Sequence, residues 1–234
     1  MANLYHVPTL PDRGEAVLSG DLAHHLLRVL RLTPGDSVIL ADGHGRTATA
    51  TVRSANRHEL LAAVSEPQIH PATQPKVTLA FACPRPARAD WLIEHGTEVG
   101  VAAFQPLWTA RSRPQSMRAE RWRKIAAAAA GQCARPHLPT IQEPLELAAF
   151  LSSQLPDRRL LADASGAPLS PATDVADVAV LIGPEGGLTD DEKQAACDQR
   201  FVRTALGPHV LRTETAALVS AAVLLQGVAG DKAP

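Results

Sequence analysis

The sequence predicts an α/β protein in which a small β-barrel-like domain precedes a larger domain of alternating strands and helices. Short apolar runs of strand type, separated by turn residues, occupy residues 1–70. A polar stretch flanked by prolines at 66–75 (EPQIHPATQP) indicates a linker. Strand-like and helix-like patterns then alternate over residues 75–230. With 45% apolar and 20% charged residues, the 234-residue chain can bury the core of a soluble globular protein.

The first domain is expected to consist mainly of short strands. Residues 36–42 (DSVILAD) form an apolar run that ends at Gly43, His44 and Gly45, and residues 47–52 alternate with the period of two that is typical of a strand. A third run covers residues 58–64. One helix, predicted at 21–30 (DLAHHLLRVL), interrupts these strands.

The second domain alternates regularly between the two kinds of element. Strands are predicted at residues 77–82, 103–108, 138–141, 159–162, 178–182 and 201–206. Helices are predicted at residues 87–99, 117–130, 190–199 and 213–225, and near 145–153. This alternation favours a parallel sheet covered by helices.

Composition excludes several classes of protein. Cys83, Cys133 and Cys197 share no spacing typical of a metal site, so we expect a reducing compartment and no bound metal. Residues 1–15 contain no apolar run long enough for a signal peptide. The longest apolar stretch, at 216–225, is too short to span a bilayer. The sequence therefore predicts a soluble, cytoplasmic protein without a membrane partner.

The net charge of −1 conceals a basic segment in the middle of the chain. Residues 108–136 contain seven basic side chains and a single acidic one, Glu120. Such a cluster is typical of a nucleic-acid surface. It is equally consistent with the solvated face of a helix, and both interpretations remain open at this point.

The most specific local pattern is the segment 178–189 (VAVLIGPEGGLT), in which an apolar strand runs into a glycine-rich turn and then a helix. Glycines at such a turn allow a ligand to approach the main chain closely. The spacing is that of neither a Walker loop nor a dinucleotide fingerprint. Thr189 and Glu192 match a capping box, and Asp190, Asp191 and Glu192 make the first helical turn acidic. Because this charge repels phosphate, a neutral or cationic small ligand suits the loop better than an anionic one, and a tight turn without a ligand is the alternative.

A second turn of the same kind lies at 206–217 (LGPHVLRTETAA), with Thr213 as the expected N-cap of the closing helix. Arg212 precedes that cap, where an arginine does not favour the helix dipole. This position makes Arg212 a functional candidate, although an ion pair with Glu185 or Glu214 would explain it equally well.

Together, 182–192 (IGPEGGLTDDE) and 206–218 (LGPHVLRTETAAL) resemble the 16S ribosomal RNA uridine-N3 methyltransferase family of the SPOUT superfamily. The resemblance extends over nearly the whole chain. It includes 24–31 (HHLLRVLR) with the following 34–36 (PGD), 98–101 (EVGV), 121–122 (RW), and 132–135 (QCAR) with Pro139. His95, Gly96 and Ala110 depart from the family pattern, which leaves open how this chain places RNA near them.

This resemblance implies a PUA-like β-barrel RNA-binding domain at 1–70 and, at 75–230, a SPOUT methyltransferase domain with a carboxy-terminal trefoil knot. It implies that S-adenosylmethionine binds against the two glycine turns and that the protein is a homodimer. The residues expected to line the cofactor are Leu161, Ile182, Gly183, Pro184, Glu185, Gly186, Leu206, Gly207, Val210 and Leu211.

The implied reaction is methylation of N3 of a uridine in 16S rRNA of the small ribosomal subunit. N3 lies on the Watson–Crick edge, so the base must be unpaired or extruded, and its proton must be lost. Arg212 is the candidate for stabilising the resulting anion, while Glu98, Glu185 and Glu214 are unranked candidates for the general base.

RNA phosphates are expected to contact the basic side chains of two segments. The candidates are Arg28, Arg31, Arg111, Arg113, Arg121, Arg123, Lys124 and Arg135. Two alternatives remain. One is a related knotted enzyme that methylates transfer RNA or a ribose hydroxyl, and the other is an RNA-binding protein that has lost its methyl donor.

Overall fold

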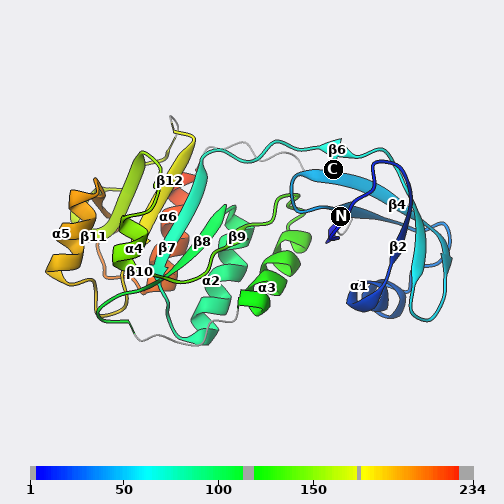
Figure 1. The fold of residues 1–234 in the computed structure, drawn as a ribbon, viewed down its shortest axis with the longest axis horizontal. Coiled ribbons are helices and arrows are strands. Elements are labelled where there is room, and N and C mark those ends of the chain that lie inside the picture. The colour runs from blue at the N-terminus through cyan, green and yellow to red at the C-terminus, as the bar shows by residue number, and fades with distance from the viewer. Residues whose placement is uncertain (1–3, 113–118, 173–174, 227–234) are drawn as a thin grey trace. The chain divides into compact units, whose positions relative to one another are not determined.

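The computed structural model describes residues 4–112, 119–172 and 175–226 (Figure 1). Contacts between residues divide the chain into two compact units. Of the described residues, the first unit comprises those up to residue 72 together with residues 130–138, and the second comprises those from 73 to 129 and from 139 onward. The prediction assigned residues 75–230 to one continuous domain, whereas residues 130–138 make their contacts within the first unit.

The first unit contains a six-stranded sheet. Its strands are β1 (Leu4–His6), β2 (Gly14–Leu18), β3 (Ser37–Ala41), β4 (Arg46–Ala55), β5 (Leu60–Val64) and β6 (Gln68–Ile69). The order is β1-β3-β4-β5-β2, with β6 paired to β4, and every pair except β1 with β3 is antiparallel. Alternate residues of β3, β4 and β5, among them Leu40, Ala50 and Leu60, fill the core.

The helix of the first unit and three of its strands differ from the prediction. The expected helix at 21–30 is a short α-helix, α1 (Gly20–His24), that continues into a π-helical segment, η1 (His25–Val29). Ala23 and Leu26 bury its apolar side. Strands β1, β2 and β6 were not predicted, because each is short or borders glycine and proline residues that indicate loops.

The second unit contains a seven-stranded sheet in which all pairs are parallel. Its strands are β7 (Lys76–Ala82), β8 (Ala103–Trp108), β9 (Thr140–Ile141), β10 (Leu145–Glu146), β11 (Arg158–Pro168), β12 (Asp177–Ile182) and β13 (Val202–Ala205). The order is β10-β8-β7-β12-β11-β13, with β9 paired to β8. The predicted α/β architecture is therefore confirmed for this unit.

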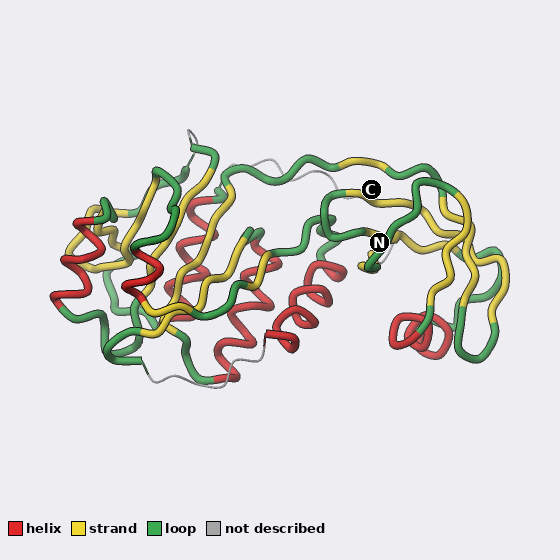
Figure 2. Tube along the Cα trace, viewed as in Figure 1, coloured by secondary structure: helices red, strands yellow, loops and turns green. Residues whose placement is uncertain are grey.

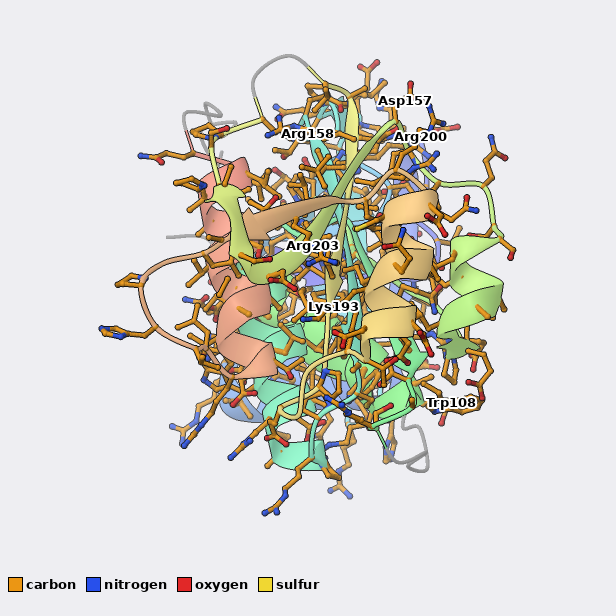
Figure 3. All side chains as sticks on the ribbon, turned by 90° about the vertical axis from the view of Figure 1, so that its left-hand side faces the viewer. Trp108, Asp157, Arg158, Lys193, Arg200 and Arg203 are labelled. Carbon is orange, nitrogen blue, oxygen red and sulfur yellow. The ribbon has the colours of Figure 1, made fainter. Side chains whose placement is uncertain are left out.

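Helices cover both faces of this sheet (Figure 2). They are α2 (Pro86–Val99), α3 (Ala119–Gln132), α4 (Leu147–Leu151), α5 (Asp190–Asp198) and α6 (Thr213–Leu224). Val77, Leu79 and Phe81 of β7 pack on the face covered by α2, α3 and α6, while Ala80 points to the face covered by α4 and α5. Figure 3 shows the strands between α6 on one side and α4 and α5 on the other. Parallel strands buried on both faces explain why their sequences are almost continuously apolar.

Within the described residues, no helix is long and apolar enough to cross a membrane.

Candidate cofactor and substrate site

A cavity of about 370 Å³ lies between a bulge in β11, the turn after β12 and the loop after β13. Ligands of open parallel sheets bind at the carboxyl ends of the strands, and this volume is in the usual range for a small-molecule site. All ten residues that the sequence assigned to the cofactor line this cavity, namely Leu161, Ile182, Gly183, Pro184, Glu185, Gly186, Leu206, Gly207, Val210 and Leu211. Apolar side chains and exposed main chain thus meet at one place.

Glycine is required around this cavity for two different structural reasons. Gly187 and Gly207 have backbone φ angles of +70° and +150°, which residues other than glycine rarely adopt. Gly183 has an ordinary φ, but a Cβ atom there would come within 3.1 Å of the Leu188 side chain. The carbonyl oxygen of Gly183 accepts a hydrogen bond of 2.9 Å from Oγ1 of Thr213. The turn is therefore tied to the start of α6.

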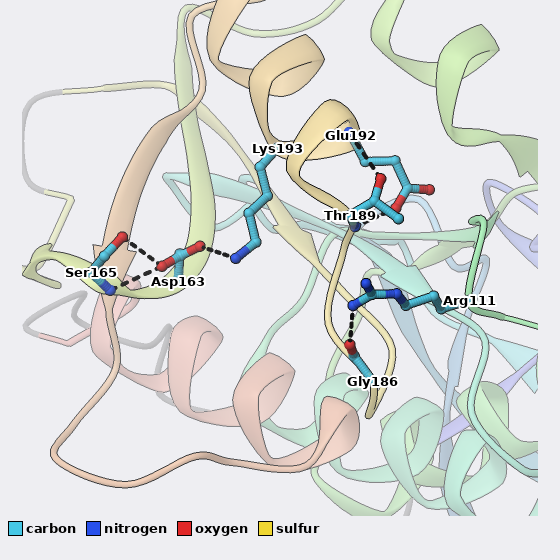
Figure 4. Close-up of polar contacts among 7 residues, drawn as sticks. All are labelled: Arg111, Asp163, Ser165, Gly186, Thr189, Glu192 and Lys193. Atoms are coloured by element: carbon cyan, nitrogen blue, oxygen red, sulfur yellow. Dashed lines mark hydrogen bonds and ion pairs between the residues drawn. The ribbon is translucent and has the colours of Figure 1, made fainter.

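The predicted capping box at the start of α5 is confirmed (Figure 4). Oγ1 of Thr189 accepts from the Glu192 N–H at 3.2 Å, and Oε2 of Glu192 accepts from the Thr189 N–H at 2.8 Å. Oε1 of Glu192 also accepts from the Ala110 N–H at 2.7 Å. With Asp190 and Asp191 in the same turn, this end of the cavity disfavours a phosphate group.

An ion pair that the sequence analysis missed lies at the same cavity. Lys193 of α5 points toward the β11 bulge, where its Nζ lies 2.9 Å from Oδ2 of Asp163 (Figures 3 and 4). Burial favours the neutral carboxyl of Asp163, but hydrogen bonds from the hydroxyl and the N–H of Ser165 and the charge of Lys193 outweigh it. They lower the pKa of Asp163 to about 2. The sequence signal that could have identified Asp163 is its position directly after the strand predicted at 159–162.

Arg111 contacts the glycine turn from a distant part of the sequence. Its Nη1 donates a hydrogen bond of 2.8 Å to the carbonyl oxygen of Gly186 (Figure 4). The sequence analysis assigned Arg111 to RNA binding alone, whereas the structure places it beside the cavity.

Arg88, near the start of α2, forms ion pairs with two of the candidate general bases. Its guanidinium hydrogen-bonds to Glu185, and its Nε lies 3.5 Å from Oε1 of Glu214. These are the two acidic residues proposed as partners of Arg212. This alternative explanation of the position of Arg212 does not hold, because Arg88 pairs with both residues and Arg212 is exposed, without a side-chain partner among the described residues. The sequence also placed the N-cap of α6 at Thr213, but Arg212 is the N-cap and Thr213 is the first helical residue.

The structure separates the three candidate bases. Glu98 pairs with His95 at the far end of α2, about 15 Å along the helix from Arg88. Glu214 is 7% exposed, and its Oε2 is buried without a hydrogen-bond partner. Glu185 is half-exposed and lines the cavity. Only Glu185 of these three therefore faces the cavity.

The predicted RNA-binding residues fall into different environments. Arg28 and Arg31 are exposed in the first unit, and Lys124 is exposed on α3. Arg121 and Arg123, also on α3, form ion pairs with Asp90 at 2.9 Å and with Glu143 at 3.5 Å.

Arg135 and Arg113 differ from the rest of that set. Arg135 is only partly exposed, and burial lowers its pKa. Arg113 lies outside the described residues.

Family models match both parts of the chain. Residues 71–225 match an RNA methyltransferase domain, and residues 18–65 match an RNA methyltransferase PUA domain. The chain is 35% identical to ribosomal RNA small subunit methyltransferase E of Mycobacterium bovis, over 94% of this chain and 90% of that protein. It is 31% identical to the Bacillus subtilis protein of the same name, over 86% of each chain.

Solved structures agree with these matches. Ribosomal RNA small subunit methyltransferase E from Neisseria gonorrhoeae, bound to S-adenosyl methionine, is similar with a TM-score of 0.86 and 26% identity, over 95% of this chain and 96% of that one. A Legionella pneumophila protein in complex with the bound cofactor SAM has a TM-score of 0.86 and 27% identity, over 97% of each chain. The chain therefore belongs to the ribosomal RNA small subunit methyltransferase E family, whose members combine a PUA domain with an S-adenosylmethionine-dependent RNA methyltransferase domain.

Proposed function

We propose that this protein binds S-adenosylmethionine in the glycine-lined cavity and methylates N3 of a uridine in 16S rRNA of the small ribosomal subunit. The observation that carries the proposal is that the ten residues assigned to the cofactor by the family resemblance, which come from three segments of the chain, line one cavity. When bound, S-adenosylmethionine supplies an electrophilic methyl group, and its transfer to N3 with loss of the N3 proton leaves neutral S-adenosylhomocysteine.

The cavity suits this ligand chemically. Leu161, Ile182 and Leu206 provide apolar surface for an adenine ring, and the main chain of the glycine turn offers hydrogen-bonding groups close to the ligand. The acidic first turn of α5 favours a cationic sulfonium over a phosphate. The adenine ring and the sulfonium of the donor therefore each find a compatible environment.

The residues of this chain divide the remaining tasks. Glu185 is the first candidate to accept the N3 proton, because it alone of the three candidate carboxylates lines the cavity. Arg88 holds Glu185 in place and compensates the buried charge of Glu214. Arg212 remains a candidate for contacting the target base from the exposed loop before α6.

The domain assignment is part of the same proposal. Residues 1–70 serve as the RNA-binding PUA-like domain of a cytoplasmic enzyme, and residues 75–230 carry the methyltransferase. The trefoil knot and the homodimer expected from the family resemblance stay predictions. Light scattering of the purified protein, with a 24.8 kDa chain, tests the dimer directly.

The test of the reaction is incubation with small ribosomal subunits from a strain lacking the enzyme, followed by mass spectrometry of the rRNA nucleosides. We expect one 3-methyluridine per subunit. A methyl group found instead on a ribose hydroxyl, or transferred to transfer RNA only, would overturn the proposed reaction while leaving the methyl donor in place.

A further inference from the structure

A second cavity lies next to the first in the second unit. It has a volume of about 450 Å³ and is lined by residues that follow β7, by two residues that follow β8 and by the glycine turn. Its lining includes Cys83, Pro84, Arg85, Arg111, Pro184 and Glu185.

The two cavities share a wall. Pro184, Glu185 and Thr213 line both of them. A methyl acceptor must approach the donor to about 3–3.5 Å, so its site must adjoin the donor site directly. The second cavity meets this geometric requirement.

The charges of the two cavities differ. Arg85 and Arg111 bring two guanidinium groups to the second cavity, and its one acidic side chain, Glu185, is already paired with Arg88. Arg85 is also the N-cap of the 14-residue helix α2, whose first turn contains no acidic residue. The dipole of α2 therefore adds positive potential, in contrast to the acidic start of α5 at the first cavity.

The lining also suits a planar base. Pro84 and Pro184 provide apolar surface, and extruded bases are typically held between apolar side chains with hydrogen bonds to their Watson–Crick edge. Burial raises the pKa of the Cys83 thiol to about 11, so the thiol stays neutral at physiological pH. At physiological pH it therefore serves as part of the wall, while at mildly alkaline pH its small thiolate fraction still reacts slowly with an alkylating reagent.

We propose that the second cavity receives the extruded target uridine. The prolines pack against the uracil ring, Arg111 faces a carbonyl oxygen of the ring from its anchor on Gly186, and Arg85 contacts an adjoining phosphate at the start of α2. This inference rests on the proposed function and adds to it the site and the contacts of the acceptor. It transfers to Arg111 the electrostatic role that the sequence assigned to Arg212.

Cys83 allows a direct test that does not depend on activity. The unmodified protein is treated with iodoacetamide at mildly alkaline pH, with and without small ribosomal subunits from a strain lacking the enzyme, and alkylation of each cysteine is followed by mass spectrometry. Cys197 is the matched internal control, because it is half-buried like Cys83 but lies on α5 outside both cavities. We expect the Cys83 rate to fall about tenfold when nine-tenths of the protein is bound, with the Cys197 rate unchanged.

A variant tests the phosphate contact by measurement of subunit binding at several salt concentrations. Arg85→Gln should lower the slope of log Kd for the subunit against log salt by about one, while the Kd for S-adenosylmethionine stays within error of wild type. Arg200→Gln, an exposed arginine after α5, is the control and should change neither quantity.

The outcomes separate the two proposals. Methylation without selective protection of Cys83, or with an unchanged salt slope in Arg85→Gln, overturns the acceptor site and leaves the proposed function standing. Selective protection without uridine methylation overturns the reaction and leaves the site standing. Absence of both removes the proposed function and this inference with it.

Discussion

Arg88 joins two acidic side chains that come from different parts of the chain. Glu185 belongs to the glycine turn and Glu214 to the first turn of α6, and Arg88 is the ion-pair partner of both. The Glu214 side chain is only 9% exposed, so its charge depends on this partner. The contact thus connects the start of α2 with two walls of the donor cavity.

We expect Arg88→Met to lower the free energy of unfolding by about 2 kcal/mol, because it leaves a buried carboxylate uncompensated. Adding Glu214→Gln should recover part of that loss, so the double variant should be more stable than the sum of the single variants predicts. Urea unfolding measures the free energy of unfolding of the two single variants and of the double variant. Arg158→Met is the control, because wild-type Arg158 makes only one long hydrogen bond, to the carbonyl oxygen of Ser170, and its loss should change stability little. Strict additivity of the two substitutions would show that the pair is not coupled.

Two glycines of the same turn provide a matched pair for the donor cavity. A Cβ atom at Gly183 would lie 3.1 Å from Cγ and 3.2 Å from the backbone N of Leu188, whereas at Gly186 its nearest neighbour would be Cδ of Arg111 at 3.7 Å. Gly183→Ala should therefore displace the turn and weaken S-adenosylmethionine binding about tenfold, or 1.4 kcal/mol. Gly186→Ala should stay near wild type. Titration calorimetry measures the Kd of both variants for S-adenosylmethionine. Equal Kd values would show that the turn accommodates a Cβ atom at Gly183.

At this scale the sequence predicted the glycines but not Arg88. A glycine-rich turn after an apolar strand is a local signal, so Gly183 and Gly207 could be assigned from neighbouring residues alone. The pairing of Arg88 with Glu185 depends on β7 and β12 lying side by side, which no local pattern specifies. For the same reason the sequence could not decide whether Arg212 pairs with Glu185 or Glu214, a pairing that the structure gives to Arg88.

At the scale of elements, Asp163 and Lys193 link the bulge of β11 to α5. The pKa of Asp163 is about 2, below its ordinary value of 3.8, so its charged form stabilises the folded state above pH 4. That stabilisation is lost as the pH falls through about 2. Asp163→Asn should therefore unfold at lower urea than wild type at pH 7, with a difference that shrinks below pH 4. Asp157→Asn, at an exposed position, is the control, and a difference independent of pH would contradict the assignment.

Substitutions on α3 can show which of its cationic side chains bind RNA and which stabilise the fold. Arg121 is paired with Asp90, which also accepts from Nε1 of Trp122 at 3.0 Å, while Lys124 is exposed. We expect Lys124→Ala to weaken subunit binding and to lower its salt slope by about one. Arg121→Ala should mainly lower the melting temperature. Filter binding at several salt concentrations and thermal unfolding separate the two, and the reverse pattern would exchange their roles.

Most elements of the second unit could be predicted because buried parallel strands and amphipathic helices have distinct periods. The exceptions are short. The predicted helix near 145–153 is a two-residue strand, β10, followed by α4, because the chain first pairs with β8 at Leu145 and Glu146. The strand predicted at 159–162 continues to Pro168 through a bulge, which is set by pairing with β13.

At the scale of the whole molecule, residues 130–138 complete the first unit from the middle of the second. The N–H of Leu138 donates to the carbonyl oxygen of Gly43 at 2.9 Å, and Nε2 of His137 hydrogen-bonds to the carbonyl oxygen of His70 at 2.9 Å. Gly131 packs so closely against Leu4 that a Cβ atom would come within 2.6 Å of its carbonyl oxygen. No sequence pattern indicated these contacts, because they join segments more than sixty residues apart.

We expect a fragment of residues 1–72 to lack a cooperative thermal transition, because a domain of that size is marginal and here loses an integral segment. The same fragment joined to residues 130–138 through a flexible glycine–serine linker should regain the transition. Circular dichroism during heating tests both. A cooperative transition of the shorter fragment at the midpoint of the longer one would show that the segment is dispensable.

This division of the chain limits which recombination events and engineered chimeras can give a folded protein. A crossover at the proline-rich linker would exchange residues 1–72 but leave residues 130–138 from the other parent, so the new first unit would meet a foreign segment. Evolution can therefore replace the PUA domain as a unit only if both stretches change together. Chimeras between relatives need crossovers at residues 72, 129 and 138, and libraries built from a single junction will consist largely of mismatched pairs.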